Sequence, residues 1–156
     1  MRRMRIAVVS FLTMFLVGSA AVCQSSAPQA PKFDHATVYV RDLDKSATFY
    51  EKVLGFERIS EPFHDGRHVW FRIGPHDQLH VVLGARAPME HDINVHLAFR
   101  VVSVLNFASQ LDKVGVKYRK SIRGDGTVAT PRADGVNQIY FQDPDGYWIE
   151  VNDDKF

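Results

Sequence analysis

The sequence predicts an α+β fold made of two paired copies of one βαβββ unit. Three observations support this prediction: a strand and helix order that occurs twice, helix boundary signals at matching places in the two copies, and strands in which apolar and polar residues alternate. Of the 156 residues, 46% are hydrophobic and 24% are charged, as expected for one globular domain. We expect the two modules at about residues 33–86 and 94–152.

The first copy begins with an alternating strand at residues 35–40, which read HATVYV. A helix is expected next, because Asp42 supplies an N-cap and Gly55 a C-terminal stop signal. Two strand-like runs follow at residues 66–73 and 78–83. The apolar stripe of the expected helix consists of Ala47, Tyr50, Val53 and Leu54.

The second copy repeats this order about 60 residues later. An alternating strand begins at His96, Ser103 supplies the N-cap of a helix, and Gly115 ends it. Strand-like runs at residues 136–142 and 147–151 flank a turn that reads DPDG. The apolar stripe of this helix consists of Val104, Ala108 and Leu111.

Strand parity separates an apolar face from a polar one. The apolar sets should face the helices; they are Ala36, Val38 and Val40; Val69, Phe71 and Ile73; Leu79, Val81 and Leu83; Val95, Leu97 and Phe99; and Ile149 and Val151. The opposite positions carry imidazole, indole and phenol groups, which are typical of a pocket lining. Trp70, Trp148, Arg100 and His68 on this face are the predicted substrate contacts.

Three histidines and one glutamate occupy matching ends of the two copies. His35 and His80 lie on the first and last strands of the first copy, and His96 and Glu150 on those of the second. If the copies pack about a pseudo-twofold axis, these side chains converge on one centre. Such a set suits one divalent ion: zinc, nickel, cobalt, manganese or iron(II). Beyond Cys23 there is no cysteine, which excludes a thiolate site.

Two stretches resemble a known family: YVRDLDKSATFYEKVLGF at residues 39–56 and QIYFQDPDGYWIEV at residues 138–151. They are similar to the vicinal-oxygen-chelate (VOC) superfamily of glyoxalases, bleomycin-resistance proteins and extradiol dioxygenases. The resemblance implies paired βαβββ modules with ligands at His35, His96 and Glu150. At the position of His80, glyoxalase I enzymes commonly carry Glu or Gln, whereas extradiol dioxygenases place a non-ligand acid-base histidine nearby.

The resemblance implies three alternative functions. The expected one is glyoxalase I or lactoylglutathione-lyase-like chemistry, in which a metal ion binds vicinal oxygens of a small substrate and Glu150 shuttles a proton. Export argues against glutathione as part of that substrate.

The second alternative is a ring-cleaving dioxygenase with iron(II), in which His80 is an acid-base residue and Tyr140 is catalytic. A further histidine of that branch is missing, because Pro131, Arg132 and Ala133 stand in its place. The third alternative is a non-catalytic ligand-binding protein of the resistance type. Such a protein does not need a complete set of ligands, so the set favours an enzyme.

The first residues are expected to be a leader. Arg2, Arg3 and Arg5 precede a charge-free run over residues 6–22, so residues 1–23 are predicted to be a signal peptide of an exported, periplasmic or secreted protein. A lipid-modified Cys23 or an uncleaved anchor is the alternative. Residues 24–31 read QSSAPQAP and are predicted to be a flexible tether to a domain at residues 32–156, without a membrane span in the mature form.

The charge of the mature chain bears on its partners. The leader carries three Arg and no acidic residue, so its removal changes the formal charge from +1 to −2. A nucleic-acid partner is therefore not expected. The expected partner is a small-molecule substrate. The sequence leaves open whether the two half-sites meet within one chain or across a homodimer.

Overall fold

The structure, a computed structural model, describes residues 29–120 and 132–155. Residues 33–156 form one unit, and residues 29–32 before it are exposed and have no regular structure. The predicted leader at residues 1–23 and the first part of the predicted tether lie outside the described residues. Within the described ranges, no helix has the length and apolar character needed to cross a membrane.

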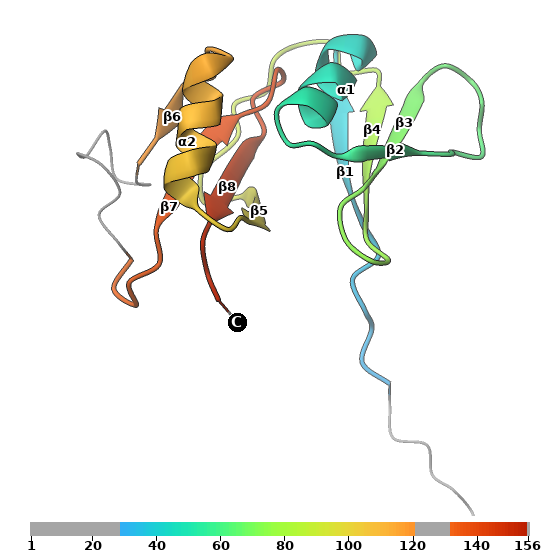
Figure 1. Ribbon diagram of the computed structural model, residues 1–156. Helices are drawn as coiled ribbons and strands as arrows, with labels where there is room; N and C mark the ends of the chain where they lie inside the picture. The colour runs from blue at the N-terminus through green and yellow to red at the C-terminus, as the bar shows by residue number, and fades with distance from the viewer. Residues whose placement is uncertain (1–28, 121–131, 156) are drawn as a thin grey trace, which may run out of the picture. The chain divides into compact units, whose positions relative to one another are not determined.

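The first module consists of one helix and four strands: β1 (His35–Val40), α1 (Leu43–Lys52), β2 (Glu57–Ile59), β3 (His68–Arg72) and β4 (Gln78–Leu83). The strands form one sheet in the order β1-β4-β3-β2, in which β1 and β4 are parallel and the other neighbours antiparallel. Helix α1 lies on one face of this sheet (Figure 1). The other face is left for the polar side chains of the strands.

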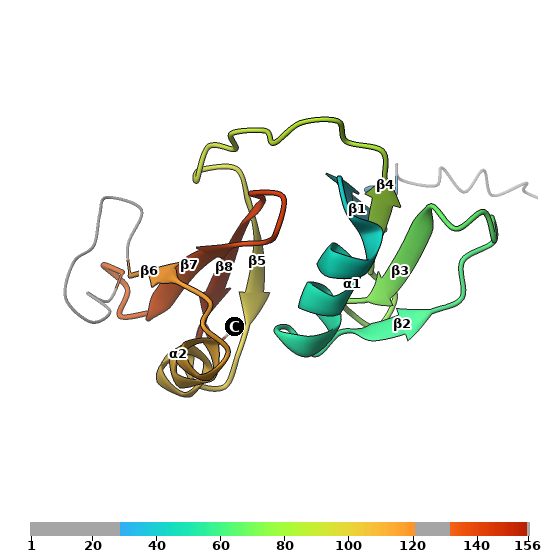
Figure 2. The same ribbon diagram turned by 90° about the horizontal axis from the view of Figure 1, so that it is seen from above.

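The second module repeats the arrangement: β5 (His96–Arg100), α2 (Val104–Lys113), β6 (Tyr118–Arg119), β7 (Gln138–Gln142) and β8 (Trp148–Asn152). The sheet order is β5-β8-β7-β6, again with one parallel pair, β5 and β8. Figure 2 shows each helix beside its own sheet. The predicted paired βαβββ architecture is therefore confirmed.

The helix boundaries agree with the sequence signals. The Asp42 carboxylate accepts a hydrogen bond from the backbone N–H of Lys45 at 3.0 Å, and the Ser103 hydroxyl accepts one from Asn106 at 3.3 Å. Gly55 and Gly115 follow the two helices with φ +72° each, a conformation in which only glycine avoids a steric penalty.

Three details differ from the prediction. The βαβββ unit implied a first strand after each helix, but the sequence did not locate these strands, β2 and β6, because runs of three and two residues show no period. The expected runs at residues 66–73 and 136–142 begin two residues late, at His68 and Gln138. Val95, which parity placed on the apolar face, is 74% exposed, because its backbone N–H closes a turn on Asp92 before β5 begins.

The apolar faces of both sheets contribute to one core. Phe56 of the first module contacts Phe99 of the second at 5.0 Å between ring centroids, and Phe49 contacts Phe141 at 6.2 Å. The other predicted apolar positions in the strands are buried or half-buried. Burial of this surface supplies the main favourable term in the stability of the domain.

A buried polar network also joins the modules through the turn between β7 and β8. Asp145 accepts hydrogen bonds from the backbone N–H and the Nε of Arg41, both at 3.0 Å, and from the Ser46 hydroxyl at 2.9 Å. Asp143 accepts one from the Tyr50 hydroxyl at 2.7 Å. Because Ser46 and Tyr50 lie on α1, this turn fixes the second module against the first module's helix.

Candidate metal-binding half-sites

Strand pairing places the four candidate ligands at equivalent positions in the two modules. His35 opens β1 and lies opposite Gln78, two residues before His80 on β4. His96 opens β5 and lies opposite Trp148, two residues before Glu150 on β8. The same backbone register therefore brings one pair of candidate ligands together in each sheet, as the sequence repeat predicted.

The first half-site is a stack of three rings. The ring of His80 stacks on that of His35 with centroids 4.2 Å apart and on that of Trp70 with centroids 3.9 Å apart. Because β4 lies between β1 and β3, His80 is the middle ring. Burial lowers the pKa of His80, and the neighbouring His35 lowers it further. His80 is therefore a neutral imidazole with a lone pair available at neutral pH.

Hydrogen bonds select which nitrogen of each ring carries the proton. Nδ1 of His35 lies 2.6 Å from a carboxylate oxygen of Asp34, so Nδ1 holds the proton and Nε2 keeps its lone pair. Nε2 of His80 lies 2.9 Å from the amide oxygen of Gln78, so this ring keeps its lone pair on Nδ1. The two histidines therefore present different nitrogens to a ligand or a proton.

The second half-site is held by hydrogen bonds around a buried carboxylate. Glu150 accepts one from the Tyr140 hydroxyl and one from the Asn152 amide, both at 2.7 Å. The Glu150 side chain is 8% exposed. Burial raises the pKa of Tyr140, and the hydrogen bond to Glu150 raises it further, so the phenol remains a donor at neutral pH. Tyr140 is thus both a packed aromatic residue and a hydroxyl at the site.

The contact between His96 and Glu150 needs a proton or a cation between the two atoms. Nδ1 of His96 lies 2.7 Å from the backbone oxygen of Ile93, which places a ring proton on that nitrogen. Nε2 then faces a carboxylate oxygen of Glu150 at 3.2 Å. Two lone pairs do not approach so closely unless a proton lies between them or a cation is bound by both atoms. The pair therefore fits a cation site.

The two half-sites do not meet within one chain. Among residues 29–120 and 132–155, no three or more His, Cys, Asp or Glu side chains are grouped closely enough to hold a metal ion. The reason lies in the packing, because the apolar faces of the two sheets share one core and the candidate ligands occupy the opposite faces. Each chain therefore offers two separate pairs of ligand-type side chains.

The predicted substrate contacts lie in different surroundings. The indole N–H of Trp70 is buried and has no hydrogen-bond partner among the described residues, whereas that of Trp148 donates to the backbone oxygen of His91 at 2.9 Å. His68 is hydrogen-bonded to Asp65 at 2.8 Å. An unpaired buried N–H costs free energy. Among the predicted substrate contacts, the Trp70 indole N–H is therefore the one that would gain from a hydrogen-bond acceptor on a ligand.

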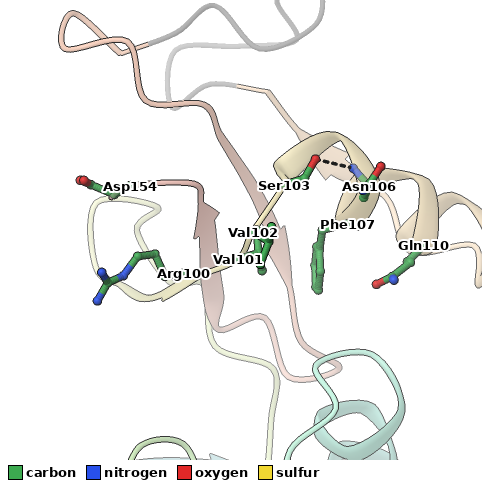
Figure 3. Close-up of a pocket in the computed structure, with 8 residues that line it drawn as sticks. All are labelled: Arg100, Val101, Val102, Ser103, Asn106, Phe107, Gln110 and Asp154. Carbon is green, nitrogen blue, oxygen red and sulfur yellow. Dashed lines mark hydrogen bonds between the residues drawn. The ribbon is translucent and has the colours of Figure 1, made fainter. Parts of the chain in front are cut away.

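Two hollows contain predicted site residues. Tyr140 and Trp148 line one of about 1050 Å³. Arg100 lines another of about 610 Å³ together with Ser103, Phe107 and Asp154, at the beginning of α2 (Figure 3). Arg100 therefore lies at the end of β5 away from His96, and its predicted substrate contact would be made in a separate hollow.

Several residues that support the site were not among the predicted site residues. Asp34 and Gln78 orient histidine rings, and Asn152 holds Glu150. A local signal was present for each, because Asp34 adjoins His35 and because Gln78 and Asn152 lie two positions from a candidate ligand on the same strand face. No comparable local signal pointed to the contacts that Asp143 and Asp145 make with the first module.

The family follows from a match over most of the chain. The family model described as Glyoxalase/Bleomycin resistance protein/Dioxygenase superfamily matches residues 32–151. The chain belongs to this superfamily. This confirms the VOC membership expected from the two sequence stretches, and it agrees with the βαβββ architecture of both modules.

Curated relatives and solved structures agree with that assignment. The chain is 28% identical over 124 residues to Glyoxylase I 4 of Arabidopsis thaliana, covering 76% of this chain and 68% of that protein. It is 26% identical over 130 residues to YwbC of Bacillus subtilis, covering 78% and 96%.

Two solved structures show the same fold. The fosfomycin resistance protein FosX of Listeria monocytogenes superposes with a TM-score of 0.64 at 23% identity, covering 82% of this chain and 97% of that one. Lactoylglutathione lyase of Agrobacterium tumefaciens superposes with a TM-score of 0.58 at 18% identity, covering 81% and 95%. At these identities the likeness shows the fold alone.

Proposed function

We propose that this VOC protein is an exported, divalent-metal-dependent enzyme that moves a proton on a small substrate bound through vicinal oxygens, as in glyoxalase I chemistry. The observation that carries the proposal is the contact of 3.2 Å between Nε2 of His96 and a Glu150 oxygen, which needs a proton or a cation between the two atoms. The similarity to Glyoxylase I 4 supports this class of reaction.

The residues present fit a metal ion. Asp34 and Ile93 engage Nδ1 of His35 and of His96, which leaves Nε2 of each ring as the ligand atom, beside Glu150 in the case of His96. With His80 and Glu150 they give three imidazoles and one carboxylate, which suits zinc, nickel, cobalt, manganese or iron(II). When bound, the metal would act as a Lewis acid that makes a neighbouring C–H more acidic.

The protein groups would orient the substrate and transfer the proton. Glu150 is the base, and its hydrogen bonds from Tyr140 and Asn152 hold the carboxylate in one orientation. Trp70 and Trp148 would form walls that keep bulk water from the reacting end of the substrate, and the free N–H of Trp70 would donate to a substrate oxygen.

The proposal requires a second copy of the chain. The candidate ligands lie on the faces of the two sheets opposite the shared core, and the Asp143 and Asp145 contacts fix the modules in that arrangement. We therefore propose that a homodimer completes each centre, with His35 and His80 from one protomer and His96 and Glu150 from its partner.

Mixing two double variants tests the shared centre. One variant carries His35→Ala and His80→Ala, and the other carries His96→Ala and Glu150→Ala. Neither should bind metal tightly alone, whereas a heterodimer made by unfolding and refolding the mixture would regain one intact centre. Calorimetric titration with Zn²⁺ and with Mn²⁺ should therefore show binding only after mixing. If both variants bind metal like the wild type, the metal site is refuted. If mixing restores nothing while the wild type binds, the shared arrangement is refuted.

One observation favours ring-cleaving dioxygenase chemistry as a second candidate. Nε2 of His80 is occupied by Gln78, whereas Nδ1 is the nitrogen of His35 that is engaged. His80 would then be an acid-base residue beside an iron(II) centre held by the other three. The variant His80→Ala separates the two assignments, because a ligand role predicts weaker metal binding, whereas an acid-base role predicts bound metal and lost turnover.

Export is proposed from the leader pattern alone. Mass spectrometry of the protein isolated from its source should find a mature N-terminus between Ala21 and Gln24. An intact Met1 on a cytoplasmic product would contradict export and leave the metal site untouched.

A further inference from the structure

The hollow beside β6 and β7 has an uneven charge. Its volume is about 1050 Å³, and four basic side chains line it: Lys45, Lys117, Arg119 and Lys120. Among residues 29–120 and 132–155, only two carboxylates, those of Asp112 and Asp143, share the lining. The excess of positive charge produces a potential that favours an anion, because a partly enclosed wall screens charges less than open water does.

The two carboxylates are already engaged. Asp143 accepts hydrogen bonds from the Tyr50 hydroxyl and from the backbone N–H groups of Asp145 and Tyr147. Asp112 lies 3.5 Å from the Tyr118 hydroxyl. Within residues 29–120 and 132–155, by contrast, none of the three lysines forms an ion pair within 4.0 Å. The charges of these three lysines are therefore not neutralised by ion pairs within the described chain.

The remaining wall is largely aromatic. Phe49, Phe141 and Trp148 line the hollow, and the guanidinium of Arg119 lies over the Trp148 ring at 5.8 Å from its centroid. A cation placed on an aromatic face beside apolar surface suits a ligand with an anionic end and an apolar body. A fully polar anion would leave the aromatic surface uncovered.

The hollow reaches the second half-site through one residue. Tyr140 lines the hollow and donates its hydroxyl hydrogen bond to Glu150 at 2.7 Å. We propose that this hollow binds the anionic end of an amphipathic small molecule, a carboxylate or phosphate on an apolar body. The assignment of that molecule as the substrate rests on the proposed function, since its reacting end would then lie beside Glu150.

The test uses Trp148 as a reporter of binding. The chain has two tryptophans, so Trp70→Phe leaves Trp148 as the single indole. The full mature chain in this background is titrated without metal with 4-phenylbutyrate, with phenyl phosphate and with the neutral 4-phenylbutanol. We expect the preferred anion to bind at least about tenfold more tightly than the alcohol, and its affinity to fall as salt is raised. The two anions distinguish a carboxylate from a phosphate ligand.

Matched charge variants locate the site. Lys120→Gln and Arg119→Gln should each weaken binding of the preferred anion by about tenfold. Lys113→Gln removes a charge from the exposed end of α2, outside the hollow, and should change the affinity by less than about twofold. Circular dichroism confirms the fold of each variant.

The outcomes separate this inference from the proposed function. Equal binding of anion and alcohol, equal effects of Lys120→Gln and Lys113→Gln, or no binding of any probe would overturn the anion site. Metal titration of the same proteins is read separately. Anion binding without metal binding refutes the proposed enzyme and keeps the anion site. Metal binding without anion binding refutes the anion site and keeps the proposed enzyme.

Discussion

The two half-sites occupy the same strand positions but are held by different forces. In the first, His80 is stacked between His35 and Trp70, and the His35 side chain is 43% exposed. In the second, Glu150 accepts two hydrogen bonds at 2.7 Å and its side chain is 8% exposed. Strand register therefore determines where a ligand-type side chain lies, and its neighbours determine how firmly it is held.

The difference matters for how a shared centre would assemble. Ring stacking leaves small rotations free, whereas a buried carboxylate with short hydrogen bonds keeps one orientation. The second half-site would thus act as a rigid template for a shared centre, and the first as a surface that adjusts to it.

The largest effect is expected from removing the buried carboxylate. Glu150→Ala leaves the Tyr140 hydroxyl and the Asn152 amide without their acceptor, so the free energy of unfolding should fall by about 3 kcal/mol. His35→Ala, at the exposed ligand position of the first half-site, should cost less than about 1 kcal/mol. Urea unfolding in the presence of a chelator measures both. Equal losses would contradict the difference in rigidity between the half-sites.

A smaller effect is expected at the equivalent positions that face His80 and Glu150. Tyr140→Phe removes a buried hydrogen bond and should lower the free energy of unfolding by about 1 kcal/mol. Trp70→Phe removes an indole N–H that has no partner among the described residues, so the loss from that group should be near zero, and the smaller ring accounts for about 0.5 kcal/mol or less. Thermal and urea unfolding should rank the two variants in this order. A greater loss in Trp70→Phe would show that its N–H is satisfied in solution.

Replacing the middle ring separates stacking from ligation. His80→Phe keeps an aromatic ring between His35 and Trp70, so the free energy of unfolding should change by about 0.5 kcal/mol at most. The proposed metal ligand or acid-base group is lost at the same time. Without Zn²⁺, the free energy of unfolding of this variant should therefore stay close to that of the wild type. The same measurement with Zn²⁺ tests whether the proposed ligand has been lost. A loss like that of Glu150→Ala would mean that hydrogen bonding to Gln78, and not stacking, holds the ring.

The smallest effect is expected when acid protonates Asp65, which is hydrogen-bonded to His68. The hydrogen bond from His68 lowers the pKa of Asp65, and the backbone N–H of Arg67 lowers it further. The contact stabilises the folded state fully above the ordinary carboxyl pKa of about 3.9. This stabilisation is lost as the pH falls through the lowered pKa of Asp65. In Trp148→Phe protein, Trp70 fluorescence should therefore shift in acid below about pH 4, because Phe63 in the same loop contacts both His68 and Trp70. Asp65→Asn should flatten the shift, and an unchanged titration in that variant would exclude Asp65 as the cause.

Local signals predicted much of this fold. The N-caps at Asp42 and Ser103 and the bounds of β1 and β4 followed from residue type and period, because both depend on neighbours within a few positions. Short strands such as β2 carry too few residues for a period to appear. The exposure of Val95 has another cause, because a turn precedes β5 and the alternation of the strand does not extend to this residue.

The candidate site was predictable only in part for the same physical reason. Equivalence of the repeats placed His35 with His80 and His96 with Glu150, since strand register depends on the local pattern. The arrangement of the modules depends instead on contacts such as that of Ser46 with Asp145, which are 99 positions apart in the chain. The DPDG sequence predicts a turn. It does not indicate that the two carboxylates of this turn bind the helix of the other module.

That turn has a consequence for engineering the molecule. The contacts of Asp143 and Asp145 with Tyr50, Ser46 and Arg41 are non-covalent and, together with the shared core, they join the modules independently of the exposed connection at residues 86–90. The chain is therefore a natural candidate for a split protein. Two fragments divided after Ala87 and produced together would associate through this turn and the shared core. Each fragment would carry one half-site, which could be exchanged or labelled by itself.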